Sequence, residues 1–282
     1  MSPDELRQFE INWRINIKQL NLKQMKTILA LVTFIVIGFN SMAQNMFIAH
    51  RGASYFAPEN TVASAKLAWE LGADAVECDV YLSQDNRVMV IHDKNTRRTC
   101  KGKKSFDIAK TPSVVLRDLD AGSWKDEKYK GEKIPFIEEL IETVPEGKTL
   151  VIEIKCGSEV LPELQRAIER KGKDDQNVFI GFDFDTMVQA QKAFPDNKCY
   201  WLSSSKPSDK KLDEVVAAGL TGINVQYKNI DEELMSAANQ RNLEVLTWTV
   251  DDPAAAKHLT EIGVKGLTTN RPKWLKEEMT KL

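Results

Sequence analysis

The sequence has little of several features that would fix its class at once. It has four cysteines in 282 residues, too few for a small disulfide-bonded scaffold. Its 39 Lys and Arg nearly balance 41 Asp and Glu, so no overall positive field would attract a nucleic-acid backbone. Hydrophobic residues make up 42%, which is too many for a disordered chain. These features leave an ordinary globular protein of one large domain or two modest ones.

A short apolar run marks the N-terminus. Residues 28–39 (ILALVTFIVIGF) carry no charge, follow Lys26 and precede Ser41-Met42-Ala43. The run is too short for a membrane span of about 20 residues, and its three-part layout is typical of a secretory signal peptide. We therefore expect cleavage after Ala43 and export to a periplasmic or extracellular compartment, with a membrane anchor as the alternative. Because residues 1–24 precede this signal, Met25 is the expected true start.

In residues 44–282, short apolar runs alternate with longer amphipathic ones. This pattern predicts nine strands, at residues 46–50, 75–81, 88–92, 149–155, 177–182, 198–202, 222–225, 244–249 and 266–268. It also predicts eight helices, at residues 60–71, 136–144, 161–171, 184–194, 209–218, 231–241, 253–262 and 272–281.

The second and third predicted strands are too close for a parallel crossover, so Gln84–Arg87 is interpreted as a hairpin turn. Eight parallel strands then remain, each followed by a helix, which predicts an α/β fold of the (β/α)8 TIM-barrel type. A doubly wound sheet is the alternative, but the Gly-rich phosphate turn that usually follows its first strand is missing. Residues 94–134 interrupt the alternation and are predicted to be an insertion on the catalytic rim.

Chemically active side chains stand at the predicted strand ends, where barrel enzymes place their sites. They are His50, Arg51, Glu77, Asp79, Glu153 and Lys155. Strand alternation puts Glu77 and Asp79 on one face. In the hairpin we expect Tyr81 opposite Val90 and Asp79 opposite His92, so that His92 stands beside Asp79. A register slip of one residue would turn His92 away.

Three carboxylates that converge would repel one another unless a cation joins them. Oxygen ligands favour Ca²⁺ or Mg²⁺ over Zn²⁺, which predicts one divalent cation held by Glu77, Asp79 and Glu153. The two histidines suit proton transfer, and Arg51 and Lys155 suit a phosphate group. Each short motif alone is more often a solvated face or an ion pair; their shared position at strand ends carries the prediction.

Other residues are weighed separately. His258 lies within a predicted helix and is expected to be structural or exposed. Phe182 and Trp248 end two further strands, where pocket wall and ordinary packing are equally expected. Cys78 and Cys156 should face the helix layer as small core residues. Export would permit a disulfide among the four cysteines, without indicating a pair.

The motifs resemble the glycerophosphodiester phosphodiesterase family over nearly the whole of residues 44–282. The resemblance rests on AHRGASYFAPENT (49–61), GADAVECDVYLSQDNRVMVIHD (72–93), LVIEIK (150–155), LTWTVDDP (246–253) and GVKGLTTNRP (263–272). It implies hydrolysis of small glycerophosphodiesters, such as glycerophosphocholine or glycerophosphoethanolamine, to sn-glycerol 3-phosphate and an alcohol. It also implies that His50 and His92 are the acid/base pair, and that Arg51 and Lys155 bind phosphate. Glu77, Asp79 and Glu153 would be the metal ligands, with Asn60 in support.

The sequence departs from the family pattern at three places. Asn270 stands where the family commonly has Asp, Asp251 where it usually has Asn, and Cys100 where it commonly has Thr. None is a matched catalytic position, so we expect these changes to affect rim contacts and leaving-group preference only.

Two alternative functions remain open at this stage. A related barrel phosphodiesterase of the sphingomyelinase D or phosphoinositide phospholipase C type would act on intact lipids and would want an apolar rim. The predicted insertion is instead polar (KDEKYKGEK), which favours a soluble substrate. A non-catalytic barrel would have a broken site, whereas every motif position carries a competent side chain. No nucleic-acid partner and no stable membrane insertion after signal cleavage are expected.

Overall fold

The computed structural model of the chain describes residues 45–102 and 104–282. The predicted signal peptide, its cleavage site and the proposed start at Met25 lie outside the described residues. The strands are β1 (Met46–Ala49), β2 (Ala75–Leu82), β3 (Val88–Val90), β4 (Thr149–Ile154), β5 (Asn177–Gly181), β6 (Lys198–Ser203), β7 (Gly222–Gln226), β8 (Glu244–Trp248) and β9 (Gly266–Thr269). All nine predicted strands are present, with ends shifted by one or two residues.

The strands close into a barrel. Their order in the sheet is β1-β9-β8-β7-β6-β5-β4-β2-β3, and a further pairing of β1 with β2 joins the two sides. Every pair except β2–β3 is parallel. Within residues 45–102 and 104–282, eight parallel strands thus form the barrel and β3 lies outside it. The (β/α)8 fold is confirmed.

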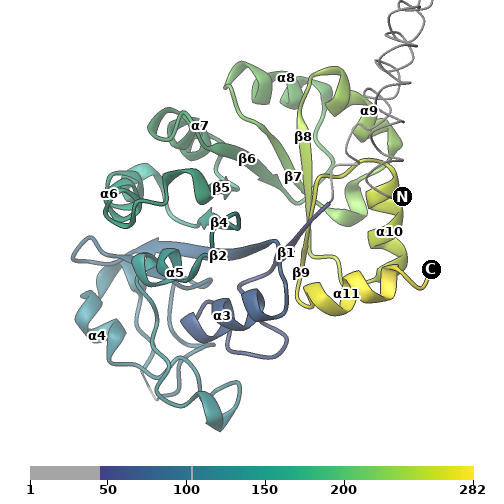
Figure 1. Cartoon of the computed structure of the whole chain (residues 1–282). Helices are drawn as coiled ribbons and strands as arrows, with labels where there is room; N and C mark the ends of the chain where they lie inside the picture. Colours follow the sequence, from purple (N-terminus) through teal and green to yellow (C-terminus); the bar gives the residue numbers. More distant parts are fainter. Residues whose placement is uncertain (1–44, 103) are drawn as a thin grey trace, which may run out of the picture. The chain divides into compact units, whose positions relative to one another are not determined.

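The helices follow the strands in turn and lie outside them (Figure 1). They are α3 (Val62–Glu70), α4 (Ser113–Arg117), α5 (Ile137–Thr143), α6 (Leu161–Lys171), α7 (Phe184–Ala193), α8 (Asp209–Ala217), α9 (Glu232–Gln240), α10 (Pro253–Glu261) and α11 (Pro272–Met279). Asp183 and Asp231 accept backbone N–H groups at the starts of α7 and α9, which satisfies donors that a helix start leaves free. His258 is exposed on α10, as expected. Among the described helices, none has both the length and the apolar character to cross a membrane.

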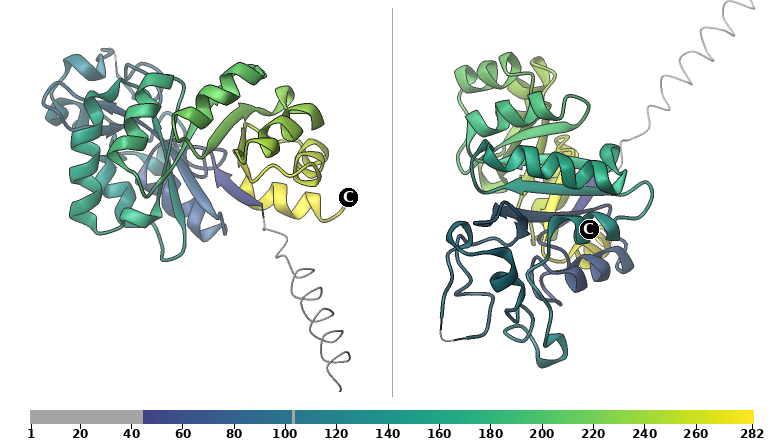
Figure 2. Two further views of the ribbon diagram at one scale, coloured as in Figure 1. Left: turned by 90° about the horizontal axis from the view of Figure 1, so that it is seen from above. Right: turned by 90° about the vertical axis from the view of Figure 1, so that its left-hand side faces the viewer.

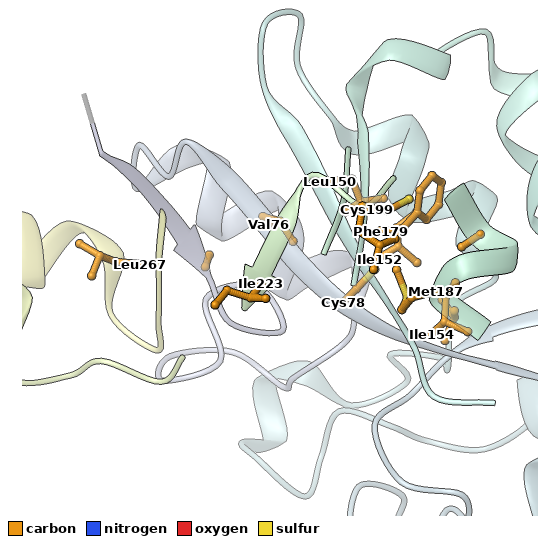
Figure 3. Packing of buried hydrophobic residues seen from close by; sticks show 14 of the residues in the cluster. Val76, Cys78, Leu150, Ile152, Ile154, Phe179, Met187, Cys199, Ile223 and Leu267 are labelled. Carbon is orange, nitrogen blue, oxygen red and sulfur yellow. The ribbon is translucent and has the colours of Figure 1, made fainter. Parts of the chain in front are cut away.

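Strand alternation separates two buried layers. Outward-facing side chains such as Val76, Cys78 and Ile152 pack against the helices, as Figure 3 shows. Inward-facing Ile48, Val151 and others fill the barrel interior. Cys78 is on the helix side, as predicted, and all four cysteines are free thiols. The alternate residues of β2 and β4, among them Glu77, Asp79 and Glu153, therefore face the barrel interior, where they can carry chemistry.

The hairpin forms, but its predicted register is wrong. Tyr81 lies opposite Met89, not Val90, so the pairing is shifted by one residue. The reason is the turn: Ser83 N donates to Arg87 O, and the loop between them has three residues with Asn86 in the left-handed region, φ 58°. Because β3 ends at Val90, His92 lies in a bend after the strand and no longer obeys strand alternation. The slip therefore does not turn His92 away from the site.

The segment 94–134 has a small core of its own. Ile108, Leu116, Ala121 and Ile134 are buried together with Met89 of β3. The sequence did not predict helix α4 here, because five residues are too few to show a helical period. Figure 2 shows this segment on the side of the barrel that is opposite α8 and α9.

Candidate active site

The loop after β1 turns sharply to bring His50 and Arg51 over the barrel. Arg51 has φ 55°, a left-handed conformation that side chains rarely adopt. Gly52 follows at φ 79°, and a Cβ there would collide with Ser64 of α3. Two hydrogen bonds of the Arg51 backbone hold the turn. Arg51 N donates to Glu77 Oε2 at 2.8 Å, and Ser64 Oγ donates to Arg51 O at 3.0 Å. Strain of this kind is typical of functional loops.

Three carboxylates meet inside the barrel at the ends of β2 and β4. Glu77 and Asp79 alternate with the outward-facing Cys78, and the strand register places Asp79 beside Glu153. One oxygen from each of the three lies within 4.8 Å of the others, a grouping that could hold a metal ion. Glu77 Oε1 and Asp79 Oδ1 are buried and have no hydrogen-bond partner among the residues that the structure describes. Buried oxygens without a partner cost free energy in a folded protein. A cation bound between the carboxylates would provide that partner.

The charges in this group do not balance. Lys155 Nζ lies 2.7 Å from Glu153 Oε1 and 3.6 Å from Asp79 Oδ1, and Arg51 Nε lies 3.5 Å from Asp79 Oδ2. Two cations thus face three carboxylates. Burial, with the neighbouring carboxylates, raises the pKa of Glu77 well above its ordinary value and raises the pKa of Glu153 to about 7. The donor set and the excess negative charge fit a hard divalent cation.

Asn60 joins the β1 loop to β2. Its Nδ2 donates to Asp79 Oδ2 at 2.8 Å, and its Oδ1 accepts from Asp79 N at 3.1 Å. Asn60 has φ 57°, a conformation that asparagine tolerates better than most residues. The first contact orients the Asp79 carboxylate, and the second holds the Asp79 backbone against the loop.

His50 is oriented by two of the positions that depart from the family pattern. Its Nδ1 lies 2.8 Å from Asn270 Oδ1. Asn270 Nδ2 in turn donates to Asp251 Oδ2, and Asp251 Oδ1 accepts from Asn270 N at 2.9 Å. The amide oxygen therefore accepts, His50 Nδ1 carries the proton, and His50 Nε2 holds the lone pair. Our expectation that these changes affect only the rim is wrong, because the segment after β9 folds back over His50.

His92 is oriented by a second chain of contacts. Its Nδ1 lies 2.7 Å from Asp93 Oδ1, and Lys155 Nζ lies 3.3 Å from its Nε2. Arg98 binds Asp93 and also Glu59, which accepts from Arg51 Nη1 at 2.8 Å. Sequence reasoning missed Glu59, Asp93 and Arg98. The hydrogen bond from Arg98, followed by the His92 contact, lowers the pKa of Asp93 to about 2, so it stays ionised beside the imidazole.

A cavity of about 150 Å³, called here the inner cavity, opens at this end of the barrel. It is lined by His50, Arg51, Glu77, His92, Glu153, Lys155, Ile180, Phe182, Leu202, Asn224, Trp248, Thr249 and Thr268. Phe182 and Trp248 are pocket walls, and their rings meet edge to face at 5.6 Å. Asn224 was missed, because one asparagine within an apolar strand gives no sequence signal. Its Oδ1 is buried without a hydrogen-bond partner in the described part of the chain, as is Trp248 Nε1.

A second cavity of about 240 Å³, the outer cavity, shares His50 and Arg51 with the inner cavity. Its walls come from the β1–α3 loop, the insertion and the segment after β9: His50, Arg51, Ser54, Tyr55, Glu59, Trp124, Lys125 and Asn270. The insertion is fixed against the loop by Lys125 Nζ, which donates to Ser54 O at 2.8 Å.

These features define a class. A parallel barrel that gathers two imidazoles, two cations and an acidic cluster at the carboxyl ends of its strands is built for a phosphoric diester. The comparisons agree. The chain belongs to the glycerophosphoryl diester phosphodiesterase family, whose model matches residues 50–274. It is accordingly an enzyme, a phosphoric diester hydrolase.

Individual relatives cover most of the chain. A glycerophosphodiester phosphodiesterase of Caldanaerobacter subterraneus is 32% identical over 243 residues, 82% of this chain and 96% of that protein. One of Bacillus subtilis is 28% identical and covers 80% of this chain and 83% of that protein. An Oleispira antarctica phosphodiesterase, solved in complex with the product sn-glycerol-3-phosphate, is 30% identical, with a TM-score of 0.78 over 83% of this chain and 96% of that one.

Proposed function

We propose that this enzyme hydrolyses small glycerophosphodiesters to sn-glycerol 3-phosphate and an alcohol, and that it needs one divalent cation to do so. The observation that carries the proposal is the meeting of Glu77, Asp79 and Glu153 beside two oriented histidines. The relatives named as glycerophosphodiester phosphodiesterases support the substrate class. The product bound to the Oleispira enzyme supports it as well.

In this proposal the three carboxylates would hold Ca²⁺ or Mg²⁺. When bound, such a cation would offset the negative charge that develops on the phosphoryl oxygens. Arg51 and Lys155 line the inner cavity and supply fixed positive charge for the same oxygens. Both are restrained by carboxylates, so they are positioned before substrate arrives.

The two histidines would move the protons. One takes a proton from the attacking oxygen as its bond to phosphorus forms. The other gives a proton to the alkoxide as its bond to phosphorus breaks, so the two histidines together gain no proton. Each imidazole has its Nδ1 bound to a side-chain oxygen, so the transfer would use Nε2; that of His92 also lies 3.3 Å from Lys155 Nζ. Burial, followed by the charge of Arg51, lowers the pKa of His50, so it begins neutral at pH 7. Phosphorus NMR would show whether water or a glycerol hydroxyl attacks, since only the latter gives a cyclic phosphate.

The glycerol part would enter the inner cavity. There the unpartnered Asn224 Oδ1 and Trp248 Nε1 offer one acceptor and one donor, which suits a hydroxyl group. The aromatic rings of Phe182 and Trp248 cover its carbon atoms. An intact lipid would need an apolar rim, whereas the outer cavity presents Glu59, Lys125 and Asn270.

The test is release of glycerol 3-phosphate from several glycerophosphodiesters, with and without a chelator, and with phosphatidylcholine for comparison. We expect release from the deacylated substrates, loss with the chelator and recovery with Ca²⁺ or Mg²⁺. Turnover of phosphatidylcholine alone, or full activity in excess chelator, would contradict the proposal.

We propose that the signal-like residues 26–43 direct export of the protein. N-terminal sequencing of the secreted protein should then begin at Gln44.

A further inference from the structure

The inner and outer cavities share two walls, His50 and Arg51. A phosphoryl group held by Arg51 therefore sits where the cavities meet, with one substituent on each side. If the glycerol part enters the inner cavity, as the proposed function has it, the other substituent points into the outer cavity. That substituent is the alcohol that leaves.

The outer cavity has walls from three separate parts of the chain. Tyr55 comes from the β1–α3 loop, Trp124 and Lys125 from the insertion, and Asn270 from the segment after β9. Lys125 Nζ lies 2.8 Å from Ser54 O and 5.9 Å from the Trp124 ring centre. One of its three N–H donors is used by the carbonyl group, so the remaining donors are available to a ligand.

The charges around this cavity are not balanced. Glu59 is the carboxylate in its wall, and it already binds both Arg51 and Arg98. Within residues 45–102 and 104–282, Lys125 has no carboxylate oxygen within 4 Å, and neither has Arg271, whose guanidinium lies over the Tyr55 ring at 4.9 Å. Of these two cations, Lys125 lines the outer cavity, where a leaving alcohol would sit.

We propose that the outer cavity binds the leaving alcohol and favours one that carries an anionic group of its own, such as a carboxylate, with Lys125 as the residue that sets this preference. The inference deepens the proposed function and rests on it. A cationic head group such as choline would meet Lys125 in this cavity and gain no carboxylate partner, because Glu59 is already paired. Complementary charge at a site rim acts mainly on specificity, which is the property predicted here.

Glycerophosphoserine and glycerophosphoethanolamine make a matched pair of substrates, since their head groups differ only by one carboxylate. We expect the wild-type full chain, loaded with Ca²⁺ or Mg²⁺, to prefer glycerophosphoserine by about tenfold in kcat/KM, the size of one charge-assisted hydrogen bond at a partly exposed site. A ratio of one or below would overturn the proposal.

Variants then test Lys125 itself. Lys125→Ala should bring the ratio of the two kcat/KM values close to one, and Lys125→Arg should keep it. Lys128→Ala is the control, because Lys128 is an exposed insertion lysine outside the cavity, 3.8 Å from Asp126. The ratio is measured within one preparation, so a variant that folds poorly lowers both values equally and leaves the ratio interpretable.

The outcomes separate the two proposals. If Lys125→Ala lowers kcat/KM equally for both substrates, Lys125 serves only to anchor the insertion to Ser54, and the specificity proposal fails. If wild-type enzyme hydrolyses both substrates at the same rate, this proposal fails while the proposed function stands. If no glycerophosphodiester releases glycerol 3-phosphate, both fail.

Discussion

The inner cavity has two unlike halves. The ends of β1, β2 and β4, together with the bend after β3, contribute the ionisable side chains: His50, Arg51, Glu77, His92, Glu153 and Lys155. The ends of β5 to β9 contribute uncharged ones: Ile180, Phe182, Leu202, Asn224, Trp248, Thr249 and Thr268. We call them the charged half and the uncharged half. The division suggests that bond making is assigned to one half and recognition of the glycerol part to the other.

The two halves should also differ in how well they tolerate substitutions. In the charged half each side chain has a partner that a substitution would leave unpaired in a buried site, which is costly. In the uncharged half, Asn224 Oδ1 and Trp248 Nε1 have no partner to lose. Changes in the charged half should therefore lower kcat, while changes in the uncharged half should raise KM.

The largest effect is expected from the acidic cluster. Glu77→Gln removes one ligand and one negative charge, and we expect loss of activity to about the level of chelated wild-type enzyme. Glu244→Gln is the control, since Glu244 opens β8 at the other end of the barrel and pairs with Lys198. Product release measured at saturating Ca²⁺ checks this, and substantial turnover by Glu77→Gln would show that the cluster is not a ligand set.

The two histidines come next. His50→Ala and His92→Ala should each lower kcat by at least about 10²-fold, because general acid or base assistance is lost. KM should change little, since Arg51 and Lys155, the residues proposed to bind the phosphate, remain. Steady-state kinetics test this, and near-normal kcat in both variants would refute the acid/base assignment.

Positioning of His50 by Asn270 should matter somewhat less. Asn270→Asp places a carboxylate against Asp251, and we expect kcat to fall about tenfold or more as the His50 ring loses its alignment. The double variant Asp251→Asn with Asn270→Asp restores a donor–acceptor pair and should recover most of the rate. No recovery in the double variant would mean that the contact is structural only.

In the uncharged half the expected effect is smaller and of another kind. Asn224→Ala removes the unpartnered Oδ1 from the inner cavity and should raise KM up to about tenfold with little change in kcat. Asn177→Ala is a matched control, because Asn177 is also buried with an unpartnered Oδ1 but stands at the start of β5. A fall in kcat with unchanged KM would contradict the division between the halves.

The smallest effect concerns stability without the cation. Because the folded-state pKa values of Glu77 and Glu153 are raised above the ordinary 4.5, these groups bind protons more tightly in the folded protein than in the unfolded one. Their stabilising contribution is therefore present below about pH 4.5, and that of Glu153 is lost as pH rises through about 7. Melting of metal-free enzyme should show a falling Tm over this range, and Ca²⁺ should reverse the fall. A Tm that rises toward pH 8 without metal would be contrary to this expectation.

The sequence predicted the charged half of the inner cavity better than the uncharged half. The charged half stands in short motifs at strand ends, so its residues could be named before the fold was known. Asn224 could not, because a buried amide is indistinguishable in sequence from a turn or surface residue. The contacts from Asp251 to Asn270 and from Asn270 to His50 were missed for another reason. They connect the loops after β8 and β9 to the end of β1, about 200 residues away, and local patterns carry no such pairing.

The hairpin shows a further limit. Its existence followed from the spacing of Tyr81 and Val88, but its register depended on whether the loop has three or four residues, which the left-handed Asn86 decides. The helices and strands were predicted well because their apolar periods run over many residues, and helix α4 was missed because its period is too short to detect.

The most direct test of the central claim is a calorimetric titration of Ca²⁺ or Mg²⁺ into metal-free full chain at pH 8, for wild type, Glu77→Gln and Glu244→Gln. The account predicts one ion per chain in wild type and in Glu244→Gln, and binding weakened by at least about tenfold in Glu77→Gln. Equal affinity in all three proteins, or no binding to wild type, would contradict it.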